Sequence, residues 1–579
     1  MKIVDILIVT GQACLIIPFV WLFGAVPLTA LARPKPPFVL SILSGFAGIS
    51  ALTWLSLRVN IEFTILLYLY EAAVAALLAY LLLRQRHRIA EFVGGIDKFP
   101  IACCFIAYIV GLSCVHILPT LPTDFRFTSI GNNDTFIYMK AADFLLNGHG
   151  AGNISGIDLR TLILEDVTGA IGFVAFVAHI LQLNTVDAVY PSLISVSAAT
   201  ATCAACFSHR WLKLSWPIAF FVGGIVIFSL FAIYHLYCCF LSQTIFNLLL
   251  IAVILDAAGR AEFNDLDKRI VAGISVLFAF DVLLIYPAFW FPAIATYAAF
   301  LAMLAVTRGD TPYKTISNLA FAIAATSGAL LLVWLTFRKR VDVVFRLMTT
   351  ANLDAAGWHL GIMDPAGFIG LPIRWVETAT LNDAGIAIVS ILILGAFLIA
   401  AAGFKERRLD PAMAPLVVFL GSLLLYVAIW LHDGAVYRQW KFAASYPSLF
   451  GFTLIGSALF VFNGMLERSG RIWLSTLAST QLLVASIASI SGGVLLAKAR
   501  NVHFPEKQFR SLASFDTRSE INDVVIDLPS FQERMLAIVF VRQKTLRFPE
   551  PTYFGAGDKS LLATDLPKAS SITQVKHAN

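Results

Sequence analysis

Long runs of apolar residues, separated by short polar segments, dominate this chain of 579 residues. Residues 38–57, 216–234 and 473–496 contain no Asp, Glu, Lys or Arg. A run of ~20 apolar residues matches the ~30 Å hydrocarbon core of a bilayer. Every backbone amide inside that core must find its partner within the chain, so these runs must form helices. The pattern therefore predicts an all-α integral membrane protein with about 13–15 transmembrane helices.

The apolar runs fall into fourteen segments that we expect to be membrane helices. These segments lie near residues 10–31, 38–57, 62–83, 99–118, 187–207, 216–236, 242–257, 270–286, 288–306, 315–336, 383–402, 412–431, 447–464 and 473–497. Residues 168–183 are also apolar, but a run this short should only dip into the membrane edge. The first run lacks a small-residue cleavage pattern and is too long for a removable signal, so we interpret it as a retained helix.

The composition excludes a soluble globular domain. Hydrophobic residues make up 59% of the chain and charged residues 13%, with a mean hydropathy of +0.80. Soluble domains carry about 25% charged residues. The formal charge of +6 does not indicate a nucleic-acid partner, because the basic residues sit in short loops where they set topology. All eight cysteines lie in apolar runs, which is typical of packing residues.

Basic residues in the short loops predict the orientation of the helices. Six such loops lie around residues 84–98, 210–213, 260–269, 308–314, 405–408 and 468–471. Provided that residues 168–183 do not cross the membrane, alternation of the helices puts all six on one side, which the excess of Lys and Arg marks as cytoplasmic. Loops 119–167 and 337–382 and the tail 498–579 then lie outside. The basic run at residues 337–340 also falls outside, where it would need a role such as binding an anionic ligand or head group.

The chain divides into three parts by composition. Residues 1–98 are extra N-terminal transmembrane helices, residues 99–497 are a transmembrane core with the two outer loops, and residues 498–579 are a small extracytoplasmic tail. The tail predicts an α/β appendage with a strand at Val524–Leu528, a helix at about 530–540 and an extended segment at 544–548. Residues 556–579 are expected to be disordered.

The first outer loop holds the main candidate for chemistry. A polar turn at residues 131–134 ends in Asn133 and Asp134, and a helical pattern runs from Thr135 to about residue 147. An amphipathic outer-loop helix directly after a membrane span should lie along the membrane interface. There Asp134 could take a proton from an acceptor hydroxyl as a general base. The alternative is that Asp134 only caps the helix.

This loop resembles the first outer loop of the GT-C superfamily of glycosyltransferases, which are multi-spanning enzymes that use polyprenyl-phosphate-linked sugars. The resemblance rests on Asp134, on Tyr138 and on the ending Leu-Leu-Asn-Gly at residues 145–148, and at the level of topology it covers residues 99–497. It implies that Asp134 is catalytic and that Asn133 and Tyr138 bind substrate. Many members carry a second acid where this chain has Asn133. A single carboxylate is a poor site for a divalent ion, so the cofactor is undecided and no metal ligand is assigned.

A second outer segment, before helix 447–464, interleaves cations with aromatic residues. Tyr437, Arg438 and Lys441 suit a polyprenyl phosphate, because the cations can bind the phosphate and the rings can contact the lipid or sugar. The segment is also similar to a basic-aromatic stretch found late in several of these transferases. The alternative is an interfacial aromatic belt with snorkelling cations. Arg374, in loop 337–382, is a further candidate for substrate binding.

Three polar residues inside the predicted helices are also candidates. Gln243, at the outer end of helix 242–257, would bond a sugar hydroxyl, or else cap the helix or bond to a neighbouring helix. Acidic residues inside a membrane are functional hypotheses by default, which applies to Glu71 and Asp281. Asp281 is close enough to the outer end of its helix to reach an outer cavity, and Glu71 has no assigned role.

Together these features predict an inverting glycosyltransferase that moves a sugar from a polyprenyl-phosphate donor to a glycan, lipid or protein acceptor of the cell envelope. It would work in a bacterial cytoplasmic membrane with its active site facing the periplasm, in contact with membrane lipids and not with nucleic acid. One alternative is an O-antigen ligase or polymerase, which relies on outer-loop arginines. Another is a transporter or flippase of lipid-linked sugars, which would show paired repeats and broken midplane helices. No repeat is visible in the sequence.

Overall fold

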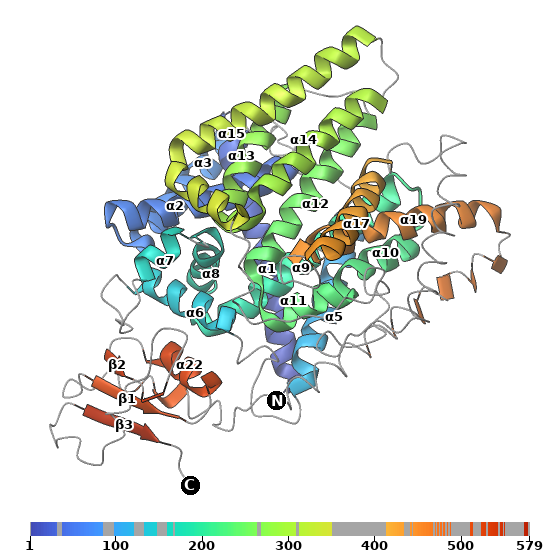
Figure 1. The fold of residues 1–579 in the computed structure, drawn as a ribbon. Helices are drawn as coiled ribbons and strands as arrows, with labels where there is room; N and C mark the ends of the chain where they lie inside the picture. The colour runs from blue at the N-terminus through green and yellow to red at the C-terminus, as the bar shows by residue number, and fades with distance from the viewer. Residues whose placement is uncertain are drawn as a thin grey trace.

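The computed structural model shows a helical body with a small α/β tail at one end (Figure 1). It describes residues 2–31, 38–84, 98–120, 133–147, 159–165, 168–262, 268–307, 312–349, 413–433, 441–442 and 444–466, isolated residues between 469 and 487, and 510–576 with several gaps. The predicted helices at 383–402 and 473–497 fall wholly or mostly outside these residues.

Within the described residues, eight helices are long and apolar enough to cross a membrane. They are α1 (Lys2–Leu31), α2 (Phe38–Val59), α3 (Phe63–Arg84), α5 (Lys98–Ile117), α9 (Thr185–Arg210), α12 (Leu241–Glu262), α15 (Pro312–Thr349) and α19 (Pro447–Met465). The remaining helices of the body are α6 (Asn133–Leu146), α7 (Leu159–Glu165), α8 (Thr168–Ile180), α10 (Trp216–Phe228), α11 (Leu230–Cys238), α13 (Lys268–Ile285), α14 (Trp290–Thr307) and α17 (Met413–Asp433). Eleven of the fourteen predicted segments coincide with single helices, so the prediction of an all-α integral membrane protein is confirmed.

The backbones of helices α1 and α2 approach each other closely, because each helix has a glycine at the contact. A Cβ added to Gly24 would lie 1.9 Å from the carbonyl oxygen of Ser41, and one added to Gly45 would lie 2.1 Å from that of Val20. Lipid gives helices no hydrophobic drive to associate, so close backbone contact supplies much of the attraction. These two glycines therefore fix how the first two helices pack.

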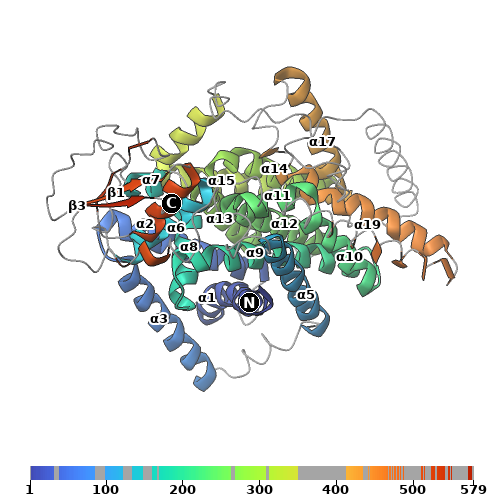
Figure 2. The ribbon, with the colours of Figure 1, turned by 90° about the horizontal axis from the view of Figure 1, so that it is seen from below.

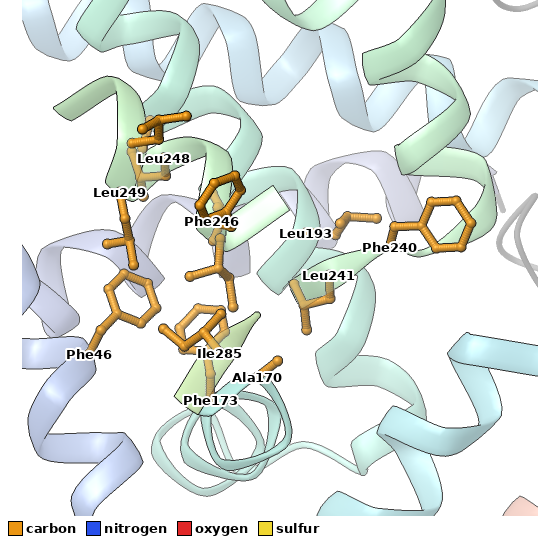
Figure 3. Close-up of a cluster of buried hydrophobic side chains, with 14 of the residues drawn as sticks. Phe46, Ala170, Phe173, Leu193, Phe240, Leu241, Phe246, Leu248, Leu249 and Ile285 are labelled. Carbon is orange, nitrogen blue, oxygen red and sulfur yellow. The ribbon is translucent and has the colours of Figure 1, made fainter. Parts of the chain in front are cut away.

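The centre of the body is formed by α9 and α12. In the most apolar stretch of each helix, 83% and 94% of the residues are buried. Side chains from five helices meet there, among them Phe46 of α2, Phe173 of α8 and Phe246 of α12 (Figure 3). The rings of Phe46 and Phe173 lie 5.2 Å apart between centroids. By contrast, only 17% of the residues in the apolar stretch of α3 are buried, and α3 stands at the edge of the body (Figure 2). Its apolar side chains are therefore free to face lipid.

Helix α8 is a core helix of the protein, and its expected place at the membrane edge stays a prediction. Its residues from Thr168 to Ala178 are all buried. It packs against α2, α6, α9 and α13, and a Cβ added to Gly172 would lie 1.9 Å from the Thr53 hydroxyl of α2. The run is apolar because other helices surround it.

The predicted helix 216–236 is broken in two at Ser229. Ser229 has an extended backbone (φ −61°, ψ 149°), and its hydroxyl accepts a hydrogen bond from the backbone N–H of Ala232 at 3.3 Å, so it caps α11. Cys239, in the left-handed conformation (φ 56°, ψ 42°), ends α11 after nine residues. Hydropathy alone does not distinguish a capped break from a continuous span, which explains the error.

The basic run at residues 337–340 lies in α15, where the backbone kinks at Phe337 (φ −125°, ψ 35°). The Arg340 side chain is 6% exposed and donates to the carbonyl oxygen of Leu164 and to the Thr168 hydroxyl, both at 2.6 Å. A further bond of 3.4 Å reaches the carbonyl oxygen of Leu284. Arg340 therefore joins the ends of α7, α8 and α13, which gives it a structural role, and an anionic ligand of the basic run stays a prediction.

The tail forms a three-stranded parallel sheet, β2-β1-β3, with one helix. Its elements are β1 (Asp523–Asp527), α22 (Phe531–Phe540), β2 (Thr545–Arg547) and β3 (Ile572–Lys576). The predicted strand, helix and extended segment match β1, α22 and β2. The expectation that residues 556–579 are disordered fails at β3, which pairs with β1 from Ile572 opposite Asp523 to Lys576 opposite Asp527. The α/β appendage is therefore present and larger than predicted.

Candidate functional site

The helix expected after the first polar turn is α6, which begins at Asn133. Asp134 therefore lies in the first turn of α6, where the helix dipole favours negative charge. The side chains of Asn133 and Asp134 fall outside the described residues. The general-base role of Asp134 and the substrate contact of Asn133 stay predictions.

Helix α6 is buried between the body and the tail, and its place along the membrane interface stays a prediction. Its charged residues Lys140 and Asp143 are only 1% and 2% exposed. Helices α8 and α9 pack on α6 from the body, and α22 packs on it from the tail (Figure 1). The tail therefore covers the polar face of α6. The hydrogen bond between Lys140 of α6 and Val541 of the tail joins residues that are 401 positions apart in sequence. This contact brings the first outer loop and the tail together, and the side of the membrane on which they lie stays a prediction.

Tyr138 of α6 reaches the start of α12. Its hydroxyl lies 2.6 Å from the Ser242 hydroxyl and accepts the backbone N–H of Ser242 at 3.2 Å. Tyr138 is 5% exposed and Ser242 is 3% exposed, so the pair is shielded from water. A buried hydroxyl needs such partners, because leaving it unpaired costs ~1–3 kcal/mol. These bonds fix α6 against the start of α12.

Gln243, the next residue of α12, holds the segment that precedes α19. Its Nε2 donates to the carbonyl oxygen of Lys441 at 2.9 Å and to the Ser445 hydroxyl at 2.5 Å. Its Oε1 accepts a longer bond, of 3.5 Å, from the Tyr286 hydroxyl. The bond to a neighbouring helical segment that the sequence offered as an alternative is therefore present. Contact between Gln243 and a sugar stays a prediction.

The Lys441 side chain is half-buried among aromatic rings. Its ammonium nitrogen lies 3.7 Å from the centre of the Phe240 ring and 5.8 Å from that of Tyr286. The Tyr286 ring in turn stacks on Phe289 at 5.1 Å, with an interplanar angle of 9°. A cation over the face of an aromatic ring is attracted by the ring quadrupole. These two rings were not predicted, since Phe240 lies between α11 and α12 and Tyr286 directly follows α13. The ring predicted to act with Lys441, that of Tyr437, falls outside the described residues.

Four segments that alternation places on the outer side therefore meet at one point. Consecutive residues of α12, Ser242 and Gln243, bind Tyr138 of α6 and the backbone of Lys441. Asp134 precedes Tyr138 by one helical turn, a rise of ~6 Å. The arrangement brings the helix α6, a cation and aromatic rings to the start of α12.

A small cavity lies one turn deeper along α12. The space open to the centres of water molecules in it is ≈ 30 Å³, enough for one or two waters. Most of its polar lining is neutral, from Ser197, Thr200, His235, Thr244, Asn247 and Ser448. Asn247 Oδ1 is buried and has no hydrogen-bond partner among the described residues. The cavity therefore offers neutral hydrogen-bonding groups directly beneath the Lys441 segment and beside the break between α10 and α11.

The two intramembrane acids have different surroundings. Glu71 Oε1 of α3 lies 3.3 Å from Nε2 of His179 at the end of α8, which gives the otherwise exposed α3 a polar contact with the body. Asp281 of α13 is fully buried, and neither carboxyl oxygen has a hydrogen-bond partner among the described residues. Asp281 is not among the residues that line the cavity above, and its expected reach to an outer cavity stays a prediction. No group of three or more His, Cys, Asp or Glu side chains that could hold a metal occurs in the described part of the chain.

Arg374, Tyr437 and Arg438 fall outside the described residues, so their predicted substrate contacts stay predictions. Sequence reasoning missed Phe240, Ser242 and Ser445. A serine at a helix start is typical of a cap, and an isolated phenylalanine is typical of an apolar run. Only the meeting of distant segments gives these residues a role.

No protein-family model matches the chain, and no curated protein matches it. Among solved structures, it is similar to ArnT from Cupriavidus metallidurans, whose crystal structure is bound to undecaprenyl phosphate. The alignment covers 83% of this chain and 90% of that one, with 10% identity and a TM-score of 0.42.

Proposed function

We propose that this chain is a membrane glycosyltransferase that takes a sugar from a polyprenyl-phosphate donor. The acceptor is a glycan, lipid or protein hydroxyl of the cell envelope, and the reaction takes place at the outer face of the cytoplasmic membrane. The acceptor oxygen attacks the anomeric carbon with inversion and forms the new C–O bond. The bond from that carbon to the phosphate oxygen breaks, and polyprenyl phosphate leaves.

One observation supports this proposal most strongly. Two consecutive residues of α12, Ser242 and Gln243, bind helix α6 of the first outer loop and the segment that contains Lys441. The two parts that the sequence assigned to acid–base chemistry and to phosphate binding are thereby held at one end of the bundle. Tyr138 is bonded to Ser242 at 2.6 Å, and Gln243 is bonded to the Lys441 carbonyl at 2.9 Å. Preorganised groups of this kind reduce the entropy needed to align donor and acceptor.

Each residue has an expected role in this reaction. Asp134 takes the proton of the acceptor hydroxyl as general base. Lys441, with Arg438, holds the phosphate and stabilises the charge that grows on it as it leaves. Tyr437 contacts the lipid or sugar through its ring. Arg374 is a further phosphate ligand.

The Asp134→Asn variant tests the reaction. Asn caps a helix as well as Asp, so the variant should fold and bind donor as the unchanged protein does. Loss of a general base typically lowers the rate by ~10²–10⁴-fold. Transfer would be followed with a radiolabelled sugar on polyprenyl phosphate and a membrane extract as acceptor. Unchanged turnover in the variant would leave Asp134 as a helix cap only.

The break between α10 and α11 beside a polar cavity favours a second candidate, a transporter or flippase of lipid-linked sugars. Broken helices that line a cavity are typical of transporters. Proteoliposomes separate the two functions, because a flippase moves a labelled lipid-linked sugar between leaflets without an acceptor. A transferase leaves the label in place until acceptor is added.

A further inference from the structure

Helix α6 is joined to the C-terminal tail by a buried ammonium group. Lys140 Nζ donates to the carbonyl oxygen of Val541 at 3.1 Å, and Val541 directly follows the end of α22. The last carbonyls of a helix carry partial negative charge, so a cation placed there caps the helix favourably. Lys140 is 1% exposed, and a charge buried to this extent persists only where it is hydrogen-bonded. The bond is therefore a specific attachment of the tail to α6.

An ion pair is the second attachment, and it holds the tail to α9, the neighbour of α6. Arg510 Nη2 lies 3.0 Å from Asp187 Oδ1, and Nη1 lies 3.3 Å from Oδ2, so the pair is bidentate. Asp187 is in the first turn of α9, which packs on α6. The guanidinium carbon of Arg510 also lies 5.9 Å from the centre of the Phe540 ring of α22. The tail therefore spans α6 and the start of α9 together.

We propose that the tail is a positioning domain for the candidate active site, and that Lys140 is the positioning residue through which it acts. Lys140 and Asp134 lie on one helix, six residues or ~9 Å apart along its axis. Tyr138 fixes one side of that helix to α12, and Lys140 fixes another side to α22. With both attachments in place α6 cannot rotate or slide, so its first turn keeps one position relative to Lys441. The role of Asp134 in this inference rests on the proposed function, but the mechanical link between tail and α6 does not.

Hydrogen exchange of the full chain in lipid nanodiscs tests the link directly. Lys140→Met keeps the aliphatic stem and removes the ammonium, whereas Lys140→Arg keeps a cation. A hydrogen bond to a charged group contributes ~1.5–3 kcal/mol, so Lys140→Met should speed exchange of the α6 amides by roughly tenfold or more. Lys140→Arg should restore most of the protection. Arg547→Gln removes an exposed cation from β2 of the same tail and should change nothing. Unchanged protection of α6 in Lys140→Met would overturn the proposal.

Kinetics test the positioning role separately. Displacement of a reacting group by about 1 Å can cost ~10²-fold in rate, so Lys140→Met should lower kcat while leaving the donor Kd unchanged, because Lys441 is intact. Lys140→Arg should recover kcat. A loss of donor affinity equal to the loss of kcat would contradict a positioning role. If the unchanged protein shows no transfer at all, the proposed function fails, and the exchange result alone decides whether the tail holds α6.

If Lys140→Met does not fold, Arg510→Gln serves instead, since the Arg510 side chain is 32% exposed and its loss is tolerated more readily. It should loosen α6 and α22 in the same direction. Protection of both helices at the level of the unchanged protein would then overturn the proposal.

Discussion

Replacement of Lys441 by methionine removes the one cation that the structure shows at the meeting point of the outer segments. Methionine keeps the length of the aliphatic stem and can still pack against Phe240. The bond from Gln243 is to the backbone carbonyl of Lys441, so it survives the substitution. The change therefore isolates the ammonium group, which lies 3.7 Å from the centre of the Phe240 ring.

The expected effects on stability and on binding differ in size. A cation over an aromatic ring contributes ~0.5–2 kcal/mol, depending on how far it is shielded from water, so the variant should fold with a small loss of stability. A charge-assisted hydrogen bond to a phosphate contributes ~1.5–3 kcal/mol. Because 1.4 kcal/mol corresponds to a factor of ten, the Kd for polyprenyl phosphate should rise by roughly 10- to 150-fold.

Binding of polyprenyl phosphate to the detergent-solubilised protein would be measured by thermophoresis. Lys268→Met is the matched control, since Lys268 also lies over a ring, 5.4 Å from the centre of Phe321, but at the end of α13 predicted to be cytoplasmic. The control should bind as the unchanged protein does, and Lys441→Arg should bind nearly as well. An unchanged Kd in a folded Lys441→Met variant would refute phosphate binding by Lys441.

Further predictions concern the fold around the site. Arg340→Leu leaves buried carbonyl groups at the ends of α7 and α13 without their donor, so thermal unfolding should show a loss of ~1–3 kcal/mol, and an unchanged Tm would show that Arg340 is dispensable. Gly24→Ala places a Cβ 1.9 Å from a carbonyl oxygen of α2 and should cost ~1–3 kcal/mol by the same assay, whereas Gly11→Ala, with nothing within 4 Å, should not. Cysteines introduced at residues 147 and 547 should react with an impermeant reagent from the same side of intact cells, and labelling of only one would contradict the topology.

The sequence was sufficient for the membrane class and most helices, because ~20-residue apolar runs have few other solutions. It also located the start of α6 and the elements β1 and α22 closely. The errors share a cause, since hydropathy reports how apolar a segment is and not what it packs against. Helix α8 is apolar because protein surrounds it, and the break at Ser229 is a cap inside an apolar run.

The candidate site was predicted as two separate motifs, and their connection could not be predicted. Tyr138 was chosen by its spacing from Asp134, and Lys441 by its aromatic neighbours. What joins them is Ser242 and Gln243, which lie more than a hundred residues from either in sequence. Pairings between distant segments leave no local pattern. The same reason hid the bond between Lys140 and the tail, which buries the polar face of α6.

The central claim is that the outer end of α12 is where a polyprenyl phosphate binds. A cryo-electron microscopy structure of the protein in nanodiscs, prepared with added polyprenyl phosphate, tests it most directly. The account predicts phosphate density within ~3 Å of Lys441 Nζ, a hydrogen-bond distance, with the lipid chain leaving between helices at the outer side. Phosphate density elsewhere on the protein, with the Lys441 ammonium still resting on Phe240 and no lipid beside it, would contradict the claim.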